Sequence, residues 1–437
     1  VDHLLQPLHR FAQVRGLLRE MNALVGLAHE ACRRAGERCP PRVRATLLIA
    51  GSTLHYGEAD LTSLLDEAWR LAEGIVEPER ALGGWFALLL DYRRFHDPDA
   101  ISRLQQLAGS EDKEVASFAA EMFGRALMSD IANRPTLEQA ASWLRRAGDW
   151  YEQRGDQWAF AGICQMLAIA QSRLGDYTGA LAWLDRAEAI YATLEDWQNT
   201  AAIGFLTRSA IARWSGRPDL AMEAVETALN LIREHGDRVM EALGLGRLSM
   251  DLVRYGDIDR ARETRERSLA LVRELAHQTN EPWNLWELGE VHRVAGSPAE
   301  ARRYYEAAGA IFRAQGHGFG MGYYERGLGD MALMASDCAA AVRHFTTARA
   351  RIGEYPDQVW SRVYVSIGLA RALVGCERPD ETLAALHETL PMVTTSTMTD
   401  LQPVLLAAAA ALALAAGRAE AAATLCGLVA AHPMTWN

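Results

Sequence analysis

Two His-Glu pairs, at 29–30 and 387–388, begin the H-E-x-x-H pattern that places two zinc-binding histidines on one face of a helix. The positions of the second histidine hold Arg33 and Pro391, so neither pair is complete. Clusters of His, Asp or Glu with the spacing of metal ligands do not occur elsewhere in the sequence. We therefore expect no metal site and no catalytic residue in this chain.

A glycine-rich segment, GHGFGMG at residues 316–322, is the nearest approach to a phosphate-binding loop. The dinucleotide fingerprint needs a strand before the glycines and a helix after them. No strand is expected before this segment, which we predict to be a flexible loop between two helical units. Lys113 is the only lysine and has no G-x-x-x-x-G-K-[ST] loop around it. We expect no bound cofactor, and any ATPase would lie outside this chain.

The composition is typical of a folded protein that does not bind nucleic acid directly. Of the 437 residues, 49% are apolar, and the net charge is -11 with a pI near 5.6. Such a chain lacks the basic surface that neutralises phosphates in nucleic-acid complexes. The most apolar stretch, residues 404–417, is too short to span a bilayer. We expect it to form a buried helix, and we expect no contact with membranes.

Six cysteines are scattered along the chain without paired spacing: Cys32, Cys39, Cys164, Cys338, Cys376 and Cys426. Most of them lie within apolar helical patterns, as the reduced thiols of a cytosolic protein do. We therefore expect all six to be reduced packing residues and the protein to be cytoplasmic.

A repeat with a period of 40 residues runs through the middle of the chain. A small residue recurs at Ala140, Ala180, Ala221, Ala261, Ala301 and Ala341, with successive spacings of 40, 41, 40, 40 and 40. A second small residue follows seven positions later, at Ala147, Ala187, Ala228, Ser268, Ala308 and Ala348. Between the two comes a larger residue: Leu144, Leu184, Val225, Arg265, Tyr305 or Phe345. Only Arg265 breaks the apolar run.

This spacing predicts a pair of packed helices in each unit. Small residues seven apart share one helical face and let a neighbouring helix approach closely, while the larger residue fills the gap between them. Glycine stands five residues before the first alanine in four units and suits a left-handed turn: Gly175, Gly216, Gly256 and Gly296, with Ser336 in the next unit. One unit cannot bury its apolar face alone, so the sequence predicts an all-α, right-handed α-solenoid.

We expect about eleven helical pairs in a single repeat domain that covers residues 1–437. Residues 1–110 would hold divergent repeats, in which the segments 16–36 and 57–74 are second helices. Residues 111–352 would hold the regular repeats, and residues 353–437 the C-terminal and capping repeats.

The signature Leu288-Gly289, Gly296, Ala301, Tyr305, Ala308 resembles the tetratricopeptide repeat, whose usual period is about 34 residues. Repeats lengthened to 40 resemble those in the C-terminal arms of bacterial signal-transduction ATPases with numerous domains, the STAND class. Residues 11–24, FAQVRGLLREMNAL, are similar to the Arg-Gly-x-x-x-Glu segment that opens such arms, with Met21 where the family often has glycine. Residues 426–436, CGLVAAHPMTW, are similar to the closing helix.

The resemblance implies a sensor arm without catalytic activity of its own. In the STAND class, which includes LuxR-type and antibiotic-regulator-type transcription activators, such arms bind an inducer, a partner protein or a foreign protein and release an ATPase module elsewhere in the polypeptide. The alternative is an independent peptide-binding adaptor or peptide-responsive regulator of the tetratricopeptide type. An all-helical enzyme is a third possibility, for which the sequence offers no clustered acids or histidines.

In such solenoids the first helix of each pair lines the concave surface, so binding residues are expected there. On the helix that begins near Pro282, Leu285, Leu288 and Gly289 occupy the packing face, and the two tryptophans occupy the opposite face, surplus to the packing of the repeat. Stepping by 40 residues gives the candidate binding set: Trp283, Trp286, Glu290, Arg293, Tyr323, Arg326 and Asp330, with Arg254, Arg213 and Trp214 further back. The alternative is that the aromatics fill the axis of the superhelix and the charges form an internal salt-bridge ladder.

Overall fold

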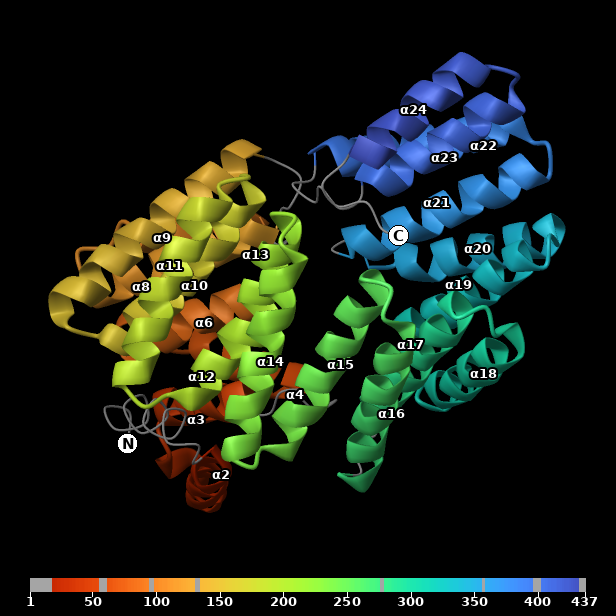
Figure 1. The fold of residues 1–437 in the computed structure, drawn as a ribbon. Coiled ribbons are helices and arrows are strands. Elements are labelled where there is room, and N and C mark those ends of the chain that lie inside the picture. The colour runs from red at the N-terminus through yellow and green to blue at the C-terminus, as the bar shows by residue number, and fades with distance from the viewer. Residues whose placement is uncertain are drawn as a thin grey trace. The chain divides into compact units, whose positions relative to one another are not determined.

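The computed structural model describes residues 18–54, 61–93, 98–129, 134–275, 279–355, 358–395 and 402–431. These residues form helices and turns only, which confirms the predicted all-α class (Figure 1). The chain divides into two compact units, residues 1–130 with 134–203 and residues 204–437 with 131–133. Residues 11–17 and 432–436, which belong to the segments similar to the two ends of a STAND arm, lie outside the described residues.

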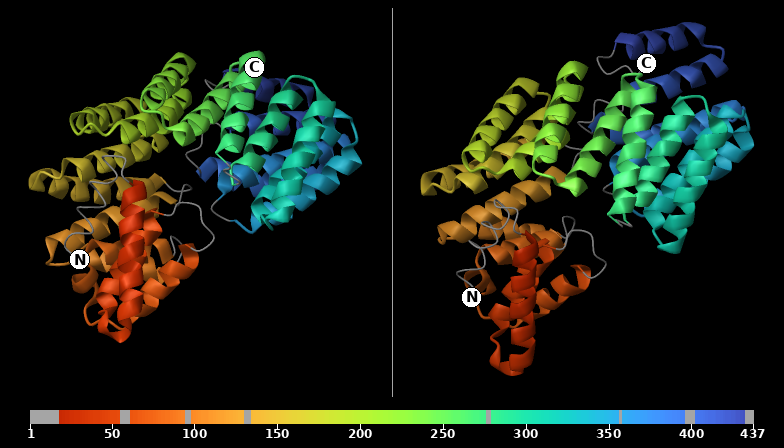
Figure 2. Two further views of the ribbon diagram at one scale, coloured as in Figure 1. Left: turned by 90° about the horizontal axis from the view of Figure 1, so that it is seen from below. Right: turned by 60° about the horizontal axis from the view of Figure 1, so that its bottom comes forward.

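The helices of the first unit range from 5 residues in α5 to 21 residues in α9. Its helices are α2 (Leu18–Ala35), α3 (Pro41–Leu54), α4 (Leu61–Glu73), α5 (Pro78–Leu82), α6 (Gly84–Arg93), α7 (Pro98–Leu107), α8 (Lys113–Ser129), α9 (Arg134–Arg154), α10 (Gln157–Arg173), α11 (Tyr177–Thr193) and α12 (Trp197–Ala202). Consecutive helices pack in antiparallel pairs, as α8 does with α9 and α10 with α11 (Figure 2).

The second unit continues the same alternation. Its helices are α13 (Ser209–Trp214), α14 (Pro218–Glu234), α15 (Arg238–Arg254), α16 (Ile258–Glu274), α17 (Glu281–Val294), α18 (Pro298–Ala314), α19 (Gly318–Met334), α20 (Cys338–Gly353), α21 (Val359–Gly375), α22 (Pro379–Thr395), α23 (Gln402–Ala415) and α24 (Ala419–Ala431). The odd-numbered helices are the first helices of their pairs, and the even-numbered ones are the second helices.

Successive first helices of the second unit contact one another, as α17 does with α19 and α19 with α21. Successive second helices do not make comparable contacts among the described residues. The first helices of this unit therefore lie on the inside of its curve, as expected for a repeat solenoid. We call the surface of α13, α15, α17, α19 and α21 that faces away from the second helices the first-helix face.

The turns between helices use the glycines that the repeat predicts. Gly175, Gly216, Gly256 and Gly296 have φ angles of +88°, +72°, +81° and +71°, and Ser336 takes the same place at +58°. An aspartate often follows and caps the next helix: Asp176 Oδ1 accepts a hydrogen bond from the N–H of Gly179 at 2.9 Å, and Asp337 Oδ1 one from Ala340 at 2.9 Å. A left-handed residue ends one helix and an aspartate begins the next, so the turn needs few residues.

The small residues of the repeat are buried where the two helices of a pair meet. All six alanines of the first set, from Ala140 to Ala341, have no exposed surface, and Tyr305 and Phe345 between the small positions are at most 1% exposed. A side chain at Gly289 would place its Cβ 2.5 Å from the ring of Tyr305, so glycine is required for this approach. The predicted packing positions are thus confirmed.

Arg265, the one charged residue in the column of large residues, is buried as well, at 3% exposed. Its guanidinium donates to the carbonyl oxygen of Gly246 and forms an ion pair with Glu287. The adjoining small position holds Ser268, whose hydroxyl donates to the carbonyl of Ala242 at 2.7 Å. A buried charge persists only with such partners, so this unit has a polar interface in place of an apolar one.

A π-helical segment, Ile203–Arg208, lies between α12 and α13. It falls in the one unit whose spacing is 41, between Ala180 and Ala221. A π turn accommodates one extra residue inside an α-helix. The irregular spacing in the sequence is therefore absorbed within a helix, and the turns on either side keep their form.

In the glycine-rich segment, Gly316 and His317 form the turn between two repeats and residues 318–322 begin α19, so the flexible loop predicted for the whole segment is wrong. Gly316 ends α18 with a φ of +64°, and His317 Nδ1 accepts a hydrogen bond from the N–H of Gly320 at 3.0 Å at the start of α19. A Cβ at Gly320 would lie 2.3 Å from the ring of Phe312. Gly320 and Gly322 serve close packing between helices, a use that a loop motif does not reveal.

Two cysteines differ from the expectation of six reduced thiols. A disulfide joins Cys32 to Cys39, with the Cα atoms 5.3 Å apart. A 3₁₀ turn, which starts at Gly36 with a φ of +56°, reverses the chain between them and brings the two side chains together. Cys164 is fully buried, and burial raises its pKa to about 12, which fits the predicted packing role.

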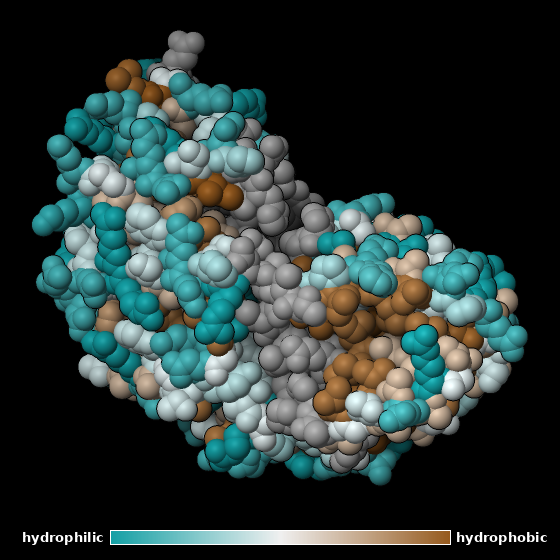
Figure 3. Space-filling model, turned by 90° about the horizontal axis from the view of Figure 1, so that it is seen from above, coloured by the Kyte–Doolittle hydropathy of each residue, from teal (hydrophilic) through white to brown (hydrophobic). Residues whose placement is uncertain are grey.

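The alanine-rich stretch is only partly buried, contrary to the prediction for residues 404–417. Leu405, Ala408 and Ala410 of α23 are buried, whereas Leu414 is 64% exposed. Apolar side chains gather on the surface over the C-terminal helices in Figure 3. The cause is that α23 has neighbours on some sides only, in α21, α22 and α24. None of the described helices is long and apolar enough to cross a membrane.

Candidate functional site

The first-helix face of the second unit brings the seven main candidate residues together. Trp283, Trp286, Glu290 and Arg293 come from α17, and Tyr323, Arg326 and Asp330 come from α19. We call this set the aromatic–ion cluster. The sequence predicts that these residues lie on neighbouring helices, and the structure shows which of them contact one another.

Trp286 is buried, so the prediction that it is surplus to packing is wrong. Its side chain is 6% exposed and belongs to a core cluster with Leu288 and Tyr305. The indole Nε1 donates to the backbone carbonyl of Tyr323 at 2.8 Å, and the guanidinium of Arg326 lies 4.9 Å from the ring centroid. The neighbouring first helix therefore covers the face of α17 that the repeat leaves open.

Trp283 is half-buried and lies among other aromatic rings. Its ring centroid is 4.8 Å from that of Phe312 and 5.2 Å from that of Tyr323, both edge to face. Phe319 adds a third contact at 6.0 Å. Aromatic pairs in this geometry stabilise packing beyond the area they bury. The contact with Phe312 of α18 shows that Trp283 also contributes to the packing of its own repeat.

The charged residues of the aromatic–ion cluster pair with one another. Glu290 accepts two hydrogen bonds from Arg293, at 3.2 and 3.0 Å, and a further one from the hydroxyl of Tyr305. Arg326 lies 3.6 Å from Glu290 and 3.8 Å from Asp330. Two guanidiniums thus face two carboxylates, and the cluster is electrically balanced. This is the salt-bridge ladder that the sequence leaves open as an alternative.

Burial and ion pairing act in opposite directions on the two acids. Burial favours the neutral form of Glu290, but Arg293, Arg326 and the Tyr305 hydroxyl outweigh it, so the pKa of Glu290 is lowered. Burial together with the charge of Glu290 raises the pKa of Asp330, and the arginines only partly offset this. Glu290 is therefore the firmly ionised member of the pair.

Arg213 and Arg254, the candidates nearer the N-terminus, both pair with a residue that the sequence analysis did not identify. Both approach Asp251, whose side chain is completely buried: Arg213 Nη1 lies 2.6 Å and Arg254 Nη1 3.5 Å from its Oδ1 atom. Arg247 is also present, with Nε 3.6 Å from Oδ2. We call these four residues the arginine cluster. Trp214 is half-buried at the end of α13 and is not one of the side chains that pair with Asp251.

Sequence spacing could have found some of the missed residues. Tyr364 of α21 lies 41 positions after Tyr323, and Arg371 lies 41 positions after Asp330. The guanidinium of Arg326 is 5.2 Å from the ring of Tyr364, so the aromatic column does continue into α21. Asp251 and Arg247 lie outside the columns defined by Trp283 to Arg293, and no repeat position marks them.

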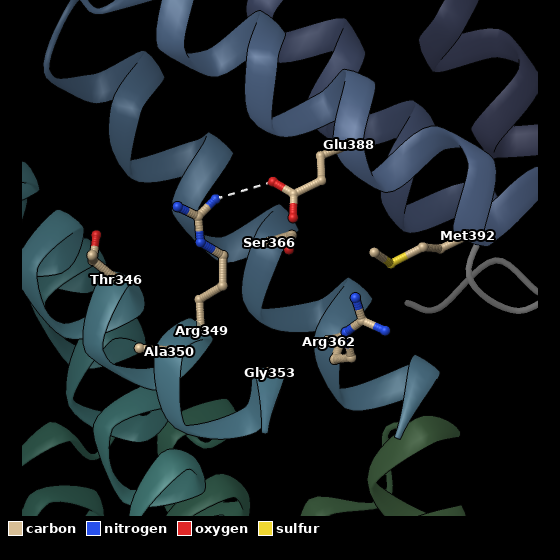
Figure 4. A pocket seen from close by; sticks show the side chains of 8 residues that line it. All are labelled: Thr346, Arg349, Ala350, Gly353, Arg362, Ser366, Glu388 and Met392. Carbon is tan, nitrogen blue, oxygen red and sulfur yellow. Dashed lines mark hydrogen bonds and ion pairs between the residues drawn. The ribbon is translucent and has the colours of Figure 1, made fainter. Parts of the chain in front are cut away.

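A surface groove of about 410 Å³ lies between α20, α21 and α22 (Figure 4). Its lining includes Arg349, Arg362, Ser366, Glu388 and Met392. Arg349 Nη1 lies 3.4 Å from Glu388 Oε2, so this pair joins the two second helices that border the groove. Its charges are satisfied within the protein, and the groove gives no reason to prefer it over the first-helix face.

The described residues contain no group of three or more His, Cys, Asp or Glu side chains that could hold a metal ion. Neither of the two clusters on the first-helix face contains a histidine or a thiol. Their chemistry is that of recognition by aromatic rings, guanidiniums and carboxylates.

Comparison with known proteins gives matches among solved structures only. No protein-family model matches the chain, and no curated protein matches it. A Rap protein complexed with competence and sporulation factor has a TM-score of 0.51 at 12% identity, covering 85% of this chain and 98% of that one. Aspartyl phosphate phosphatase F from Bacillus subtilis has a TM-score of 0.50 at 12% identity, covering 80% and 93%.

A third structure is the STAND protein with a tetratricopeptide repeat sensor from Pyrococcus horikoshii. Its TM-score is 0.48 at 16% identity, and the match covers 83% of this chain but 55% of that protein, so the chain spans about half of its length. Identities this low establish the fold alone. The chain is an α-solenoid of tetratricopeptide-like repeats.

Proposed function

We propose that this chain is the non-catalytic sensing and interaction arm of a STAND-type NTPase regulator. It recognises a trigger, a polypeptide or a polar small molecule, on the first-helix face of its second unit. The observation that carries this proposal is that aromatic and charged side chains of α17, α19 and α21 meet on that face, where Trp286 and Arg326 are buried but Glu290 and Arg293 keep exposed surface. The NTPase and the effector, whether for transcription, proteolysis or defence, would belong to other parts of the polypeptide.

The internal pairing of the aromatic–ion cluster supports a rigid binding surface. Arg293 remains 27% exposed and Glu290 19%, although both are held in fixed geometry by each other. Side chains that are ordered before binding lose little conformational entropy when a partner arrives. The first-helix face also carries an exposed apolar residue: Leu243, in the same repeat position as Trp283, is 47% exposed. Aromatic and arginine anchors with an apolar surround are typical of protein interfaces.

The second candidate function is an independent peptide-binding adaptor or peptide-responsive regulator. One observation favours it: the match to the Rap protein covers 98% of that chain, so a repeat array of this size can make up a protein by itself. The Rap protein was crystallised with competence and sporulation factor, which is a ligand of that protein. The natural open reading frame separates the two candidates, because a STAND regulator has an NTPase module in the same polypeptide and an adaptor has none.

The binding face can be tested with exposed residues that do not support the core. The whole chain is used to capture partners from the native lysate, alongside Leu243→Asp and Arg371→Glu on the first-helix face. A matched control, Arg302→Glu, lies exposed on the second helix α18. We expect a partner, identified by mass spectrometry, that the wild type and the control retain and that both first-helix variants lose.

Melting curves by circular dichroism establish that the three variants are folded. Capture that survives both first-helix substitutions but is lost with Arg302→Glu would place the binding face on the second helices and refute the proposal.

A further inference from the structure

Two free thiols, those of Cys338 and Cys376, lie side by side in the second unit. Cys338 is the first residue of α20, and Cys376 is the residue that follows α21. A Cβ atom at Gly375 would lie 2.3 Å from the sulfur of Cys338, so this sulfur occupies the space beside the last residue of α21. A hydrogen bond joins the two thiols. The two side chains are therefore in contact before any bond forms between their sulfurs.

The separation of 38 residues explains why these thiols meet. The hydroxyls of Tyr323 and Ser361, which are also 38 positions apart, lie 2.7 Å from each other. The guanidinium of Arg326 lies 5.2 Å from the ring of Tyr364, at the same separation in the sequence. These pairs join α19 to α21, and the two cysteines continue the same register beyond the C-terminal ends of both helices. The contact between the thiols thus follows from the stacking of successive repeats.

Both thiols of this pair are partly exposed, so a small oxidant can reach them. The other free cysteines differ, since Cys164 is fully buried and Cys426 lies exposed on α24. Partial burial and the neighbouring Cys338 raise the pKa of Cys376. A thiolate is the attacking species in disulfide exchange. We therefore expect the sulfur of Cys338 to react first and that of Cys376 second.

We propose that Cys338 and Cys376 form a redox-reactive pair, which closes to a disulfide by exchange with oxidised glutathione or another low-molecular-weight disulfide. The thiolate of Cys338 attacks one sulfur of the oxidant and expels one glutathione thiolate, which leaves a mixed disulfide on Cys338. The thiolate of Cys376 then attacks the Cys338 sulfur, and the second glutathione leaves. The two protein thiols lose two protons and two electrons, and the oxidant takes them up as two reduced glutathiones.

The disulfide would tie two successive repeats together. It would join the start of α20 to the end of α21 and so fix the distance between the C-terminal ends of α19 and α21. The aromatic–ion cluster reaches α21 through the contact of Arg326 with Tyr364, so oxidation would also fix this part of the first-helix face. The inference goes beyond the proposed function, because the pair would react whether or not that face binds a trigger.

The test uses the full chain, equilibrated in glutathione buffers that range from fully reduced to fully oxidised. Remaining thiols are blocked with iodoacetamide, and the tryptic peptides are analysed by mass spectrometry without reduction. Residues 327–343 carry Cys338 and residues 372–418 carry Cys376, so a linked pair of these two peptides reports the disulfide. We expect the linked pair to accumulate in the monomer as the buffer becomes more oxidising.

Closure should also raise the melting temperature, because the cross-link spans 38 positions and restricts the unfolded chain. We expect oxidation to raise it by roughly 5 °C more in the wild type than in Cys338→Ser or Cys376→Ser. The comparison cancels any effect of the disulfide between Cys32 and Cys39, which every variant retains. The matched control, Cys426→Ser, keeps the pair and should behave as the wild type does.

Three results would overturn the inference. The first is glutathione attached separately to each thiol with no linked peptides, and the second is two unmodified thiols after equilibration in oxidised glutathione alone. The third is a linked pair found only in covalent dimers, because the two sulfurs would then belong to different chains. Peptide mapping of the wild type needs no substitution, so a serine variant that fails to fold leaves the test intact.

Discussion

At the scale of single residues, Trp286 is buried because the neighbouring helix α19 covers the face of α17 that its own repeat leaves open. The repeat identifies the face of α17 that packs against α18, and Leu288 and Gly289 lie there as predicted. It does not specify how closely the next first helix approaches the opposite face. That distance depends on the curvature of the unit, which many side chains determine together. Trp286 therefore reads as exposed in the sequence and is buried in the structure.

Glu290 offers a test of the aromatic–ion cluster through pH. Glu290→Gln removes the charge-assisted hydrogen bonds to Arg293 and Tyr305 and should lower the free energy of unfolding by about 2 kcal/mol at neutral pH. The pKa of Glu290 is lowered in the folded state, so its stabilisation is complete above the unfolded pKa and disappears as the pH falls through the folded value. Denaturant unfolding at neutral and acidic pH should show the difference between wild type and variant shrinking in acid.

Glu300→Gln is the matched control for this measurement. Glu300 pairs with Arg303 on α18 at 47% exposure, and an exposed pair of this kind contributes at most about 1 kcal/mol. A difference for Glu290→Gln that stays constant down to strongly acidic pH would contradict the lowered pKa.

At the scale of helices, the sequence predicts which segments are helical and which helices pack together. It does not predict where a helix departs from regular α geometry. The 40-residue spacing locates α14, α16, α18 and α20, because close packing requires small residues at fixed steps. The π-helical segment Ile203–Arg208 is visible only as one spacing of 41. Its extra residue could equally have lengthened a turn, and spacing alone does not distinguish the two. The helical start of residues 318–322 was missed because glycine reads as a loop signal.

The π segment predicts that one residue can be removed from this helix without loss. Deletion of Leu206, which is 53% exposed, should convert the segment to α-helix and leave the melting temperature unchanged or higher, because a π turn is less favourable than an α turn. Deletion of Leu243 in the regular helix α15 is the control. It should lower the free energy of unfolding by roughly 3 kcal/mol or more, since Leu245 and Leu248 would leave the core. If chemical denaturation shows that both deletions lower the free energy of unfolding by similar amounts, then Leu206 is not a removable residue.

At the scale of the whole molecule, the register of the repeat is the most predictable property. It runs from Ala140 to Ala341 and so passes through residue 203, where the first compact unit ends. The disulfide between Cys32 and Cys39 could not be predicted from the sequence. The two cysteines are seven positions apart in a divergent repeat, and this spacing carries no signal for pairing. Distant solved structures share the architecture at 12% identity, which shows how few residues are needed to specify it.

The register predicts that one complete repeat can be removed. Deletion of residues 297–336 would join Gly296 directly to Asp337 and bring α20 against α17, with Phe345 and Ala348 in the places of Tyr305 and Ala308. We expect a shorter, folded chain with cooperative unfolding by circular dichroism and with mean helicity per residue unchanged.

Deletion of residues 300–336 is the control, because it leaves extra residues between Gly296 and Asp337 and disrupts the capped turn. The prediction fails if the two shortened chains unfold at the same temperature.

The turn made of a left-handed glycine and an aspartate cap has a genetic consequence. Gly175-Asp176 and Gly256-Asp257 are the same two residues at the same place in the repeat, and each pair completes its turn almost unaided. Unequal crossing-over between two such sites would add or remove whole helical pairs without creating a new loop. Exchange between neighbouring turns would add or remove one helical pair, and exchange between Gly175-Asp176 and Gly256-Asp257, with Gly216 between them, would add or remove two.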